Sequence, residues 1–247
     1  ALLIEGERTS VVSQKGGARV LPLEHAMQVG YQDAAISEAI IGQLLKAGQI
    51  SAVIAKGAEW QLVQVTDGNL TVLASFRTLP GERRFAPELA AYRLDRLLQL
   101  GMVPVTVSRK IDGRWGTLQL LPGVTLTERE RVAAGQGKEA ICPVGRQIDA
   151  MLVFDALVHN GARSPSSMVY DREEWTLMLV DHESAFSTDE SLPADLVNVE
   201  LIVSDEWRAA LLSLSDKVLR KELGDALDKQ RLRALGKRRD ALISLGD

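Results

Sequence analysis

The sequence predicts an α+β fold in two parts, a small sheet-rich part followed by a mainly helical part. Short alternating runs of apolar and polar residues, separated by glycine-containing turns, dominate the first half of the chain. From about residue 146 the apolar positions recur at the spacing of an α-helix. With 46% hydrophobic residues among 247, the chain can form one large domain or two closely packed lobes.

The first elements follow a region without regular spacing. Residues 1–30 mix glycine, serine and charged side chains, and we interpret them as an N-terminal arm that packs on the body. From residue 33 the apolar positions fit a helix of about four turns that ends at Gly48. Asp67-Gly68 is typical of a hairpin turn between two strands. The strands expected here are 51–55, 60–66 and 70–76.

A second helix and two more strands complete the predicted first lobe. Pro87 suits the first turn of a helix, and Gly101 stands just past its expected end. Asp112-Gly113 predicts the turn between strands at 103–109 and 115–121. We therefore assign residues 31–125 to an N-lobe with a helix, an antiparallel sheet and an inserted helix.

The remainder, residues 126–247, is predicted to form a helical C-lobe. A polar stretch at 125–137 marks the boundary, and the apolar spacing after it predicts a buried helix that ends near Gly161. We place this helix at 146–158 and expect strands at 168–170 and 175–180, followed by amphipathic helix over 192–245.

Charge and cysteine content exclude several classes of protein. The formal net charge is −4, so no general basic field would attract nucleic acid, and we interpret Lys237-Arg238-Arg239 as a solvated helix face without a partner. Cys142 is the single cysteine, which excludes an internal disulfide. The apolar runs are too short for a membrane span. Cytoplasmic location is favoured, whereas a leader removed before Ala1 would make the protein periplasmic or secreted.

Two segments carry a family resemblance. The first is the stretch 87–98, PELAAYRLDRLL, followed by Met102-Val103-Pro104. The second is FDALVHNGAR at 154–163, continued by LVDHESAF at 179–186. Both resemble the kinase-like superfamily of HipA, the secretory-pathway (Golgi casein) kinases and the phosphoinositide kinases, over roughly residues 50–245. The resemblance implies a two-lobed protein-kinase-like fold, with ATP and Mg²⁺ or Mn²⁺ as cofactors.

In such kinases a strand lysine, fixed by a helix glutamate, meets the nucleotide phosphates. The resemblance puts Arg77 at the lysine position and Glu88 at the glutamate position. Arginine keeps the charge but has a planar, forked head, so the phosphate geometry would change. Lys56-Gly57 stands where kinases have a phosphate-covering loop, although a single glycine favours an ordinary turn.

The catalytic loop departs further from the family pattern. Related kinases carry Asn-x-Asp-Arg, whereas this chain has Asn160-Gly161-Ala162-Arg163. Ala162 cannot orient an acceptor hydroxyl or accept its proton. Ser167 replaces a metal-binding asparagine, and Asp181 matches the metal-binding aspartate.

Two neighbouring residues could replace the missing carboxylate as the base. Asp155 lies in the helix before the loop, and His159 has a side chain that titrates near neutral pH. Each also has a structural interpretation, Asp155 as a brace for the loop and His159 as a helix-terminal residue.

The sequence therefore favours a pseudokinase-like protein with impaired catalysis and a binding, regulatory or scaffolding role towards a protein partner, with residual nucleotide binding. The alternative is an active ATP-dependent phosphotransferase, or another nucleotide transferase, with a rearranged site. It would use Asp181 for the metal and Asp155 or His159 as base. We find no P-loop, dinucleotide-binding or Gly-x-Ser-x-Gly motif, and we expect neither a nucleic-acid partner nor a membrane span.

Overall fold

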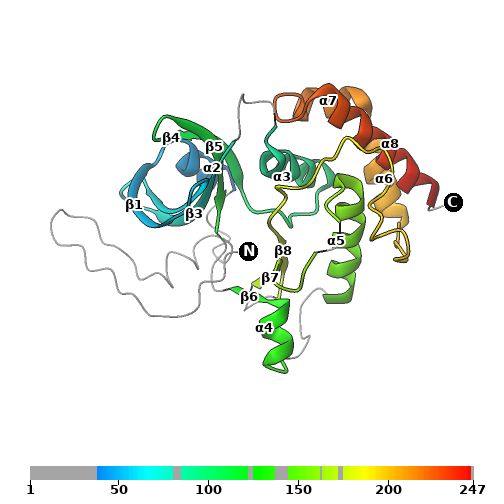
Figure 1. Cartoon of the computed structure of the whole chain (residues 1–247), viewed down its shortest axis with the longest axis horizontal. Coiled ribbons are helices and arrows are strands. Elements are labelled where there is room, and N and C mark those ends of the chain that lie inside the picture. Colours follow the sequence, from blue (N-terminus) through cyan, green and yellow to red (C-terminus); the bar gives the residue numbers. More distant parts are fainter. Residues whose placement is uncertain are drawn as a thin grey trace. The chain divides into compact units, whose positions relative to one another are not determined.

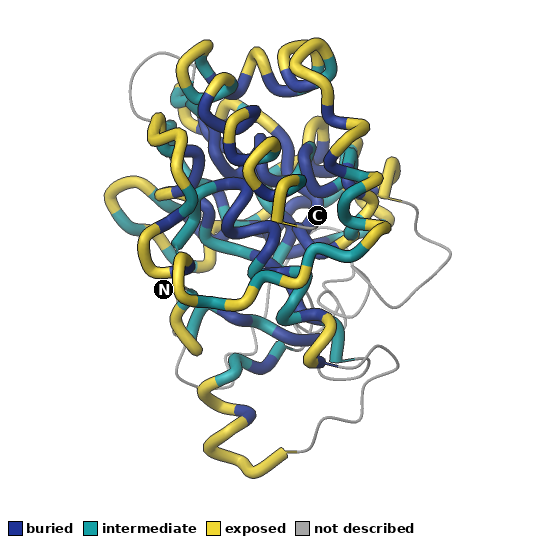
Figure 2. Tube along the Cα trace, turned by 90° about the vertical axis from the view of Figure 1, so that its right-hand side faces the viewer, coloured by how far each residue is buried: buried dark blue, intermediate teal, exposed yellow. Residues whose placement is uncertain are grey.

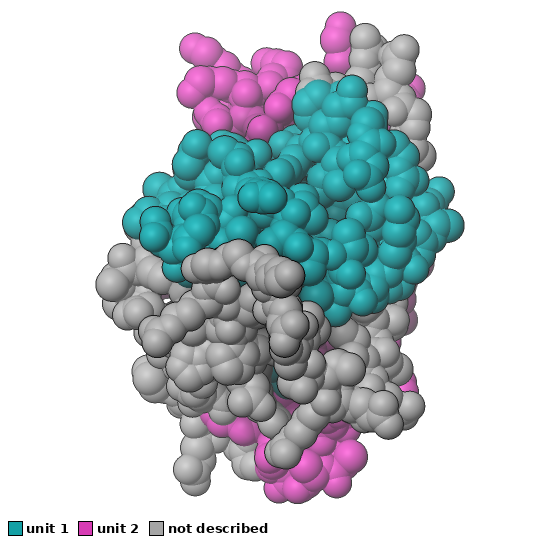
Figure 3. All heavy atoms as spheres, turned by 90° about the vertical axis from the view of Figure 1, so that its left-hand side faces the viewer, with its two compact units in different colours: residues 1–78, 104–125 teal, residues 79–103, 126–247 magenta. Residues whose placement is uncertain are grey.

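The computed structural model describes residues 38–79, 85–121, 125–136, 144–161, 163–171 and 175–245. The chain divides into two compact units, Ala1–Thr78 with Pro104–Thr125, and Leu79–Val103 with Leu126–Asp247 (Figure 3). The first unit ends at Thr125, and the division into lobes at residue 125 stays a prediction. The helix that opens at Pro87, which we expected in the first lobe, clusters with the second unit. The predicted arm at 1–30 lies outside the described residues.

The first unit is a five-stranded antiparallel sheet with one described helix. The strand order is β1-β2-β3-β5-β4, and α2 packs against β2, β4 and β5. Apolar side chains of α2 and of the sheet, such as Leu45, Val63 and Phe76, form the buried core of this unit. The elements are α2 (Glu38–Ala47), β1 (Gln49–Lys56), β2 (Trp60–Thr66), β3 (Thr71–Thr78), β4 (Thr106–Ile111) and β5 (Arg114–Leu120).

Both predicted hairpins are present, and local chemistry explains each turn. Between β2 and β3 the carboxylate of Asp67 accepts hydrogen bonds from the backbone N–H of Asn69 and Leu70, both at 2.9 Å. Between β4 and β5, Asp112 and Gly113 have φ angles of 50° and 78°. Two successive positive φ angles define the turn that matches the twist of a two-residue hairpin.

The second unit is mainly helical and carries a small three-stranded sheet in the order β6-β7-β8. Helix α8 packs against α5, α6 and α7, and α3 packs against α6 and α7 (Figure 1). Figure 2 shows the buried segments of the chain, and α5 supplies much of this core. The elements are α3 (Pro87–Leu98), β6 (Thr125–Thr127), α4 (Glu128–Ala133), α5 (Val144–Val158), β7 (Met168–Asp171), β8 (Leu177–Leu179), α6 (Asp205–Ser213), α7 (Asp216–Leu223) and α8 (Lys229–Leu245).

Three details differ from the sequence predictions. The polar stretch after residue 125 contains α4, which starts with a capping box of Thr127 and Glu130. Helix α3 ends at a left-handed Gln99, two residues before the expected Gly101. The segment 192–204 contains no helix. In the described part of the chain, no helix is both long and apolar enough to cross a membrane.

Candidate functional site

The loop that follows α5 carries the kinase-like motif. His159 and Gly161 both have left-handed backbone conformations, with φ angles of 57° and 68°, which turn the chain sharply at the end of the helix. The backbone N–H of Asn160 donates to the carbonyl of Asp155 at 2.9 Å. The backbone N–H of Phe186 donates to the carbonyl of Val158 at 2.5 Å, so the segment after β8 is joined to the end of α5.

A buried ion pair lies beneath this loop. Arg163 donates to Asp155 through two bonds, from Nε to Oδ2 at 2.7 Å and from Nη2 to Oδ1 at 3.0 Å. The two side chains are only 2% and 1% exposed. The Nδ2 group of Asn160 also donates to Asp155 Oδ1 at 3.3 Å, and Arg163 Nη1 donates to the carbonyl of Val180. A two-pronged, desolvated pair of this kind fixes geometry and engages both carboxylate oxygens of Asp155.

His182 extends the pair to α3. Its Nε2 lies 2.8 Å from Arg163 Nη2, and its Nδ1 lies 3.1 Å from Glu88 Oε2. Because a guanidinium can only donate, Nε2 must accept, and the ring proton therefore resides on Nδ1 and is donated to Glu88. The backbone N–H of His182 donates to Glu88 Oε1 at 2.7 Å. We call Glu88, His182, Arg163 and Asp155 the buried chain; it joins α3, the segment after β8, and α5.

A small pocket opens next to the buried chain. It has a volume of about 240 Å³, and every described residue that lines it is polar. Asp181 is the carboxylate of this lining and has a φ angle of 66°. Ser167 Oγ donates to the carbonyl of Ser164 at 3.1 Å and lies 3.3 Å from Ser164 Oγ. The lining consists of Asn160, Arg163, Ser164, Ser167, Asp181 and Ser184.

The donor set of this pocket fits a hard divalent cation. Asp181 offers a carboxylate, Ser167 offers a hydroxyl oxygen, and Asn160 offers Oδ1 because its Nδ2 is bonded to Asp155. Mg²⁺ is commonly held by one or two carboxylates together with nucleotide phosphates and water. Among the described residues no group of three His, Cys, Asp or Glu side chains could hold a metal, so such an ion would need a nucleotide to complete its ligands.

The predicted site residues fall into two sets. The first set belongs to the second unit and either lines the pocket or forms part of the buried chain beside it. Its members are Asp155, Asn160, Arg163, Glu88 and Asp181. His159 is half-buried at the end of α5, and Ala162 lies outside the described residues.

The residues predicted to meet the nucleotide from the sheet lie in the first unit. Arg77 is in β3, opposite Trp60 on one neighbouring strand and Thr117 on the other. The backbone N–H of Gly57 donates to the carbonyl of Trp60 at 2.9 Å, so Lys56-Gly57 opens the turn between β1 and β2. A Cβ atom on Gly57 would also lie 2.3 Å from Trp60 Nε1. A nucleotide-binding role for Lys56, Gly57 and Arg77 stays a prediction.

Two residues near the site were missed by the sequence analysis. Asp195 lies against the loop, because a Cβ atom on Gly161 would be 3.0 Å from Asp195 Oδ2. Arg238 is wrongly interpreted as part of a solvated face: it is fully buried, and its Nε donates to the carbonyl of Leu157 at 2.8 Å. Its Nη1 donates to the carbonyl of Asp189. Burial lowers the pKa of Arg238 to about 10, so it remains a cation at neutral pH.

Comparisons with known proteins support the fold. No protein-family model and no curated protein matches the chain. The structure is similar to that of the Golgi casein kinase with Mn/ADP bound, with a TM-score of 0.60 and 12% identity over 85% of this chain and 76% of that one. It is also similar to the Helicobacter pylori proinflammatory kinase CtkA, with a TM-score of 0.51 and 12% identity over 82% of this chain and 96% of that one. The chain therefore has a kinase-like α+β fold, with an antiparallel sheet first and helices second.

Proposed function

We propose that this chain is a pseudokinase-like protein that binds a metal–nucleotide weakly, transfers phosphate poorly or not at all, and acts by regulating or scaffolding a protein partner. The observation that carries the proposal is the state of Asp155. It is the buried carboxylate closest in sequence to Ala162, and it is already bonded by Arg163 and Asn160.

Phosphoryl transfer requires a group that orients the acceptor hydroxyl in addition to the cations that offset phosphate charge. Ala162 supplies no such group. Asp155 would have to break a buried, two-pronged pair to do so, which leaves Arg163 as an uncompensated buried charge. Loss of a general base costs about 10²- to 10⁴-fold in rate, and this loss accounts for impaired transfer without loss of the fold.

Residual nucleotide binding is supported by the polar pocket. Asp181, Asn160 and Ser167 would hold the divalent cation, which would neutralise charge on the nucleotide phosphates. In the neighbour solved with Mn/ADP the fold carries both ligands. The same pocket favours the alternative of an active transferase, in which His159 would serve as the base because Asp155 is engaged.

A thermal-shift titration with ATP, with and without Mg²⁺ or Mn²⁺, tests the binding part. A ligand at about one hundred times its Kd stabilises the folded state by about 2.7 kcal/mol, which for a chain of this size raises Tm by about 5–10 °C. We expect a metal-dependent shift in the native chain that is lost in Asp181→Ala. Glu200→Ala, an exposed carboxylate outside the pocket lining, is the matched control and should retain it.

Release of ADP, measured on the same samples, tests the impaired transfer. Nucleotide binding without turnover supports the proposal. Turnover that disappears in Asp181→Ala would support the active-transferase alternative instead. If Tm does not change at millimolar ATP, nucleotide binding is not part of the function, and the chain would act only by binding a protein partner.

A further inference from the structure

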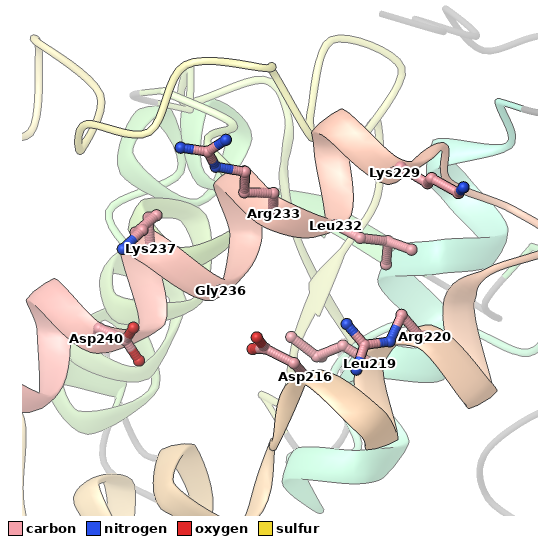
Figure 4. Close-up of a pocket in the computed structure, with 9 residues that line it drawn as sticks. All are labelled: Asp216, Leu219, Arg220, Lys229, Leu232, Arg233, Gly236, Lys237 and Asp240. Carbon is pink, nitrogen blue, oxygen red and sulfur yellow. The ribbon is translucent and has the colours of Figure 1, made fainter.

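A second polar pocket lies between α7 and α8, on elements that take no part in the candidate site. Its volume is about 450 Å³ (Figure 4). Four cations line it: Arg220 comes from α7, and Lys229, Arg233 and Lys237 come from α8. In Figure 4 the two helices face each other across the pocket, and Asp216 points from α7 towards the middle of α8.

The two carboxylates of this pocket share one ion-pair partner, the guanidinium of Arg239. Arg239 Nη1 lies 3.0 Å from Asp216 Oδ1, and Arg239 Nη2 lies 2.6 Å from Asp240 Oδ1. Gly236 permits the close approach of the two helices, because a Cβ atom there would lie 3.2 Å from Asp216 Oδ1. With Arg239 counted, five cations outnumber the two carboxylates, so the pocket keeps a net positive charge.

The cations themselves lack such compensation. Three of the cations are exposed and have no ion-pair partner among the described residues: Arg220, Lys229 and Lys237. Arg233 pairs with Glu190 at 2.9 Å, but both side chains are largely exposed, at 72% and 45%, so this pair exchanges readily with another anion. Like charges four residues apart on a helix repel one another, and an anionic ligand would relieve that repulsion.

The spacing of the cations on α8 indicates the shape of the anion. Lys229, Arg233 and Lys237 follow one another at intervals of four residues, which is about 6 Å along a helix axis. Alternate side chains of an extended peptide point to the same side and recur at about 6.6 Å. An extended peptide with acidic residues at every second position therefore presents one negative charge to each cation in turn.

We infer that the pocket between α7 and α8 binds an extended acidic peptide segment of a partner protein. Leu232, which is half-buried, lies among the charged residues and supplies an apolar contact for an intervening side chain of that peptide. Single-stranded nucleic acid has a comparable spacing of charges, but such strands are normally held by stacking on aromatic side chains, and the described lining contains none. The inference goes beyond the proposed function and does not depend on nucleotide binding.

Fluorescence anisotropy with the full chain tests this inference. The probe is a fluorescein-labelled nonapeptide of alternating glutamate and alanine, and the comparison peptide has glutamine in place of glutamate. We expect the glutamate peptide to bind at least about tenfold more tightly, and its affinity to fall as salt is raised. Equal binding of the two peptides, or no binding of the glutamate peptide at millimolar concentration, would overturn the inference.

Substitution of the cations locates the binding. The variant Lys229→Gln/Arg233→Gln/Lys237→Gln should bind the glutamate peptide about tenfold more weakly. The matched control, Lys46→Gln/Lys110→Gln/Lys217→Gln, makes the same change of net charge at exposed positions that do not line the pocket, and should bind within about twofold of the native chain.

Equal weakening in both variants would indicate a general charge effect and overturn the site. Tighter binding of a labelled thymidine nonanucleotide than of the peptide would overturn the choice of ligand. Because the glutamate and glutamine peptides are compared on the native chain, the inference remains falsifiable even if a variant folds poorly.

Discussion

Removal of Arg163 from the buried chain should be among the most damaging single substitutions in the protein. In Arg163→Met, Asp155 would keep only the bond from Asn160 Nδ2 at 3.3 Å, with its side chain still 1% exposed. A buried carboxylate that loses its partner costs about 3–5 kcal/mol. The carbonyl of Val180 and Nε2 of His182 lose donors as well. We therefore expect the free energy of unfolding to fall by about 3–5 kcal/mol, measured by urea denaturation.

The pair itself is tested by a double-mutant cycle. Asp155→Leu should cost about as much as Arg163→Met, whereas the double variant should cost only about 1–3 kcal/mol, since no buried charge is left unpaired. The coupling energy should then be at least about 3 kcal/mol. Arg93→Met is the matched control: it breaks the pair with Asp225, whose side chains are 32% and 67% exposed, and should cost less than about 1 kcal/mol. A coupling energy below about 1 kcal/mol between Asp155 and Arg163 would refute the buried chain.

Three further predictions address the loop, a buried tyrosine and the missing carboxylate. Gly161→Ala should lower the free energy of unfolding by about 1–2 kcal/mol in urea denaturation, because φ at Gly161 is 68° and the new Cβ would lie 3.0 Å from Asp195 Oδ2. The control is Gly145→Ala in α5, where the space at Cβ is open, and this change should not lower the free energy of unfolding. Burial raises the pKa of Tyr170 to about 12. The absorbance titration curve of Tyr170→Phe, subtracted from that of the native chain, should therefore have its midpoint well above the ordinary pKa of about 10. The stability that the neutral phenol contributes is complete below pH 10 and is lost as pH rises to about 12, and a midpoint at the ordinary value would contradict this assignment. Ala162→Asp should raise ADP release at least about tenfold if the orienting carboxylate is the principal defect, and an unchanged rate would place the defect elsewhere.

The sequence predicts elements whose cause is local and misses those whose cause is distant. Asp67-Gly68 and Asp112-Gly113 form turns through their own backbone preferences and nearby hydrogen bonds, so both hairpins could be predicted. The capping box at Thr127 and Glu130 is also local, and this signal would have located α4.

The contacts that build the site have no such signal. Glu88 and His182 are 94 residues apart in the chain, and only the packing of α3 against the segment after β8 brings them together. Arg238 sits in a run of three basic residues that suggests a solvated surface, yet its guanidinium holds the carbonyl at the end of α5. Side-chain periodicity in a helix with many charges cannot tell which one of them is buried.

The buried chain changes what the kinase-like motif says about chemistry. Asp155, Arg163 and Glu88 are held in place by one another or through His182, so loss of any one of them would leave a buried group without its partner. Their presence in the motif is therefore explained by folding alone and is not evidence of transfer. Asp181 is different, because its carboxylate lines the polar pocket beside Asn160. The distinction between a pseudokinase and an active enzyme therefore rests on turnover. Asp181→Ala should weaken nucleotide binding in either case, and it should abolish ADP release only if the native chain releases ADP, whereas substitutions in the buried chain should alter stability first.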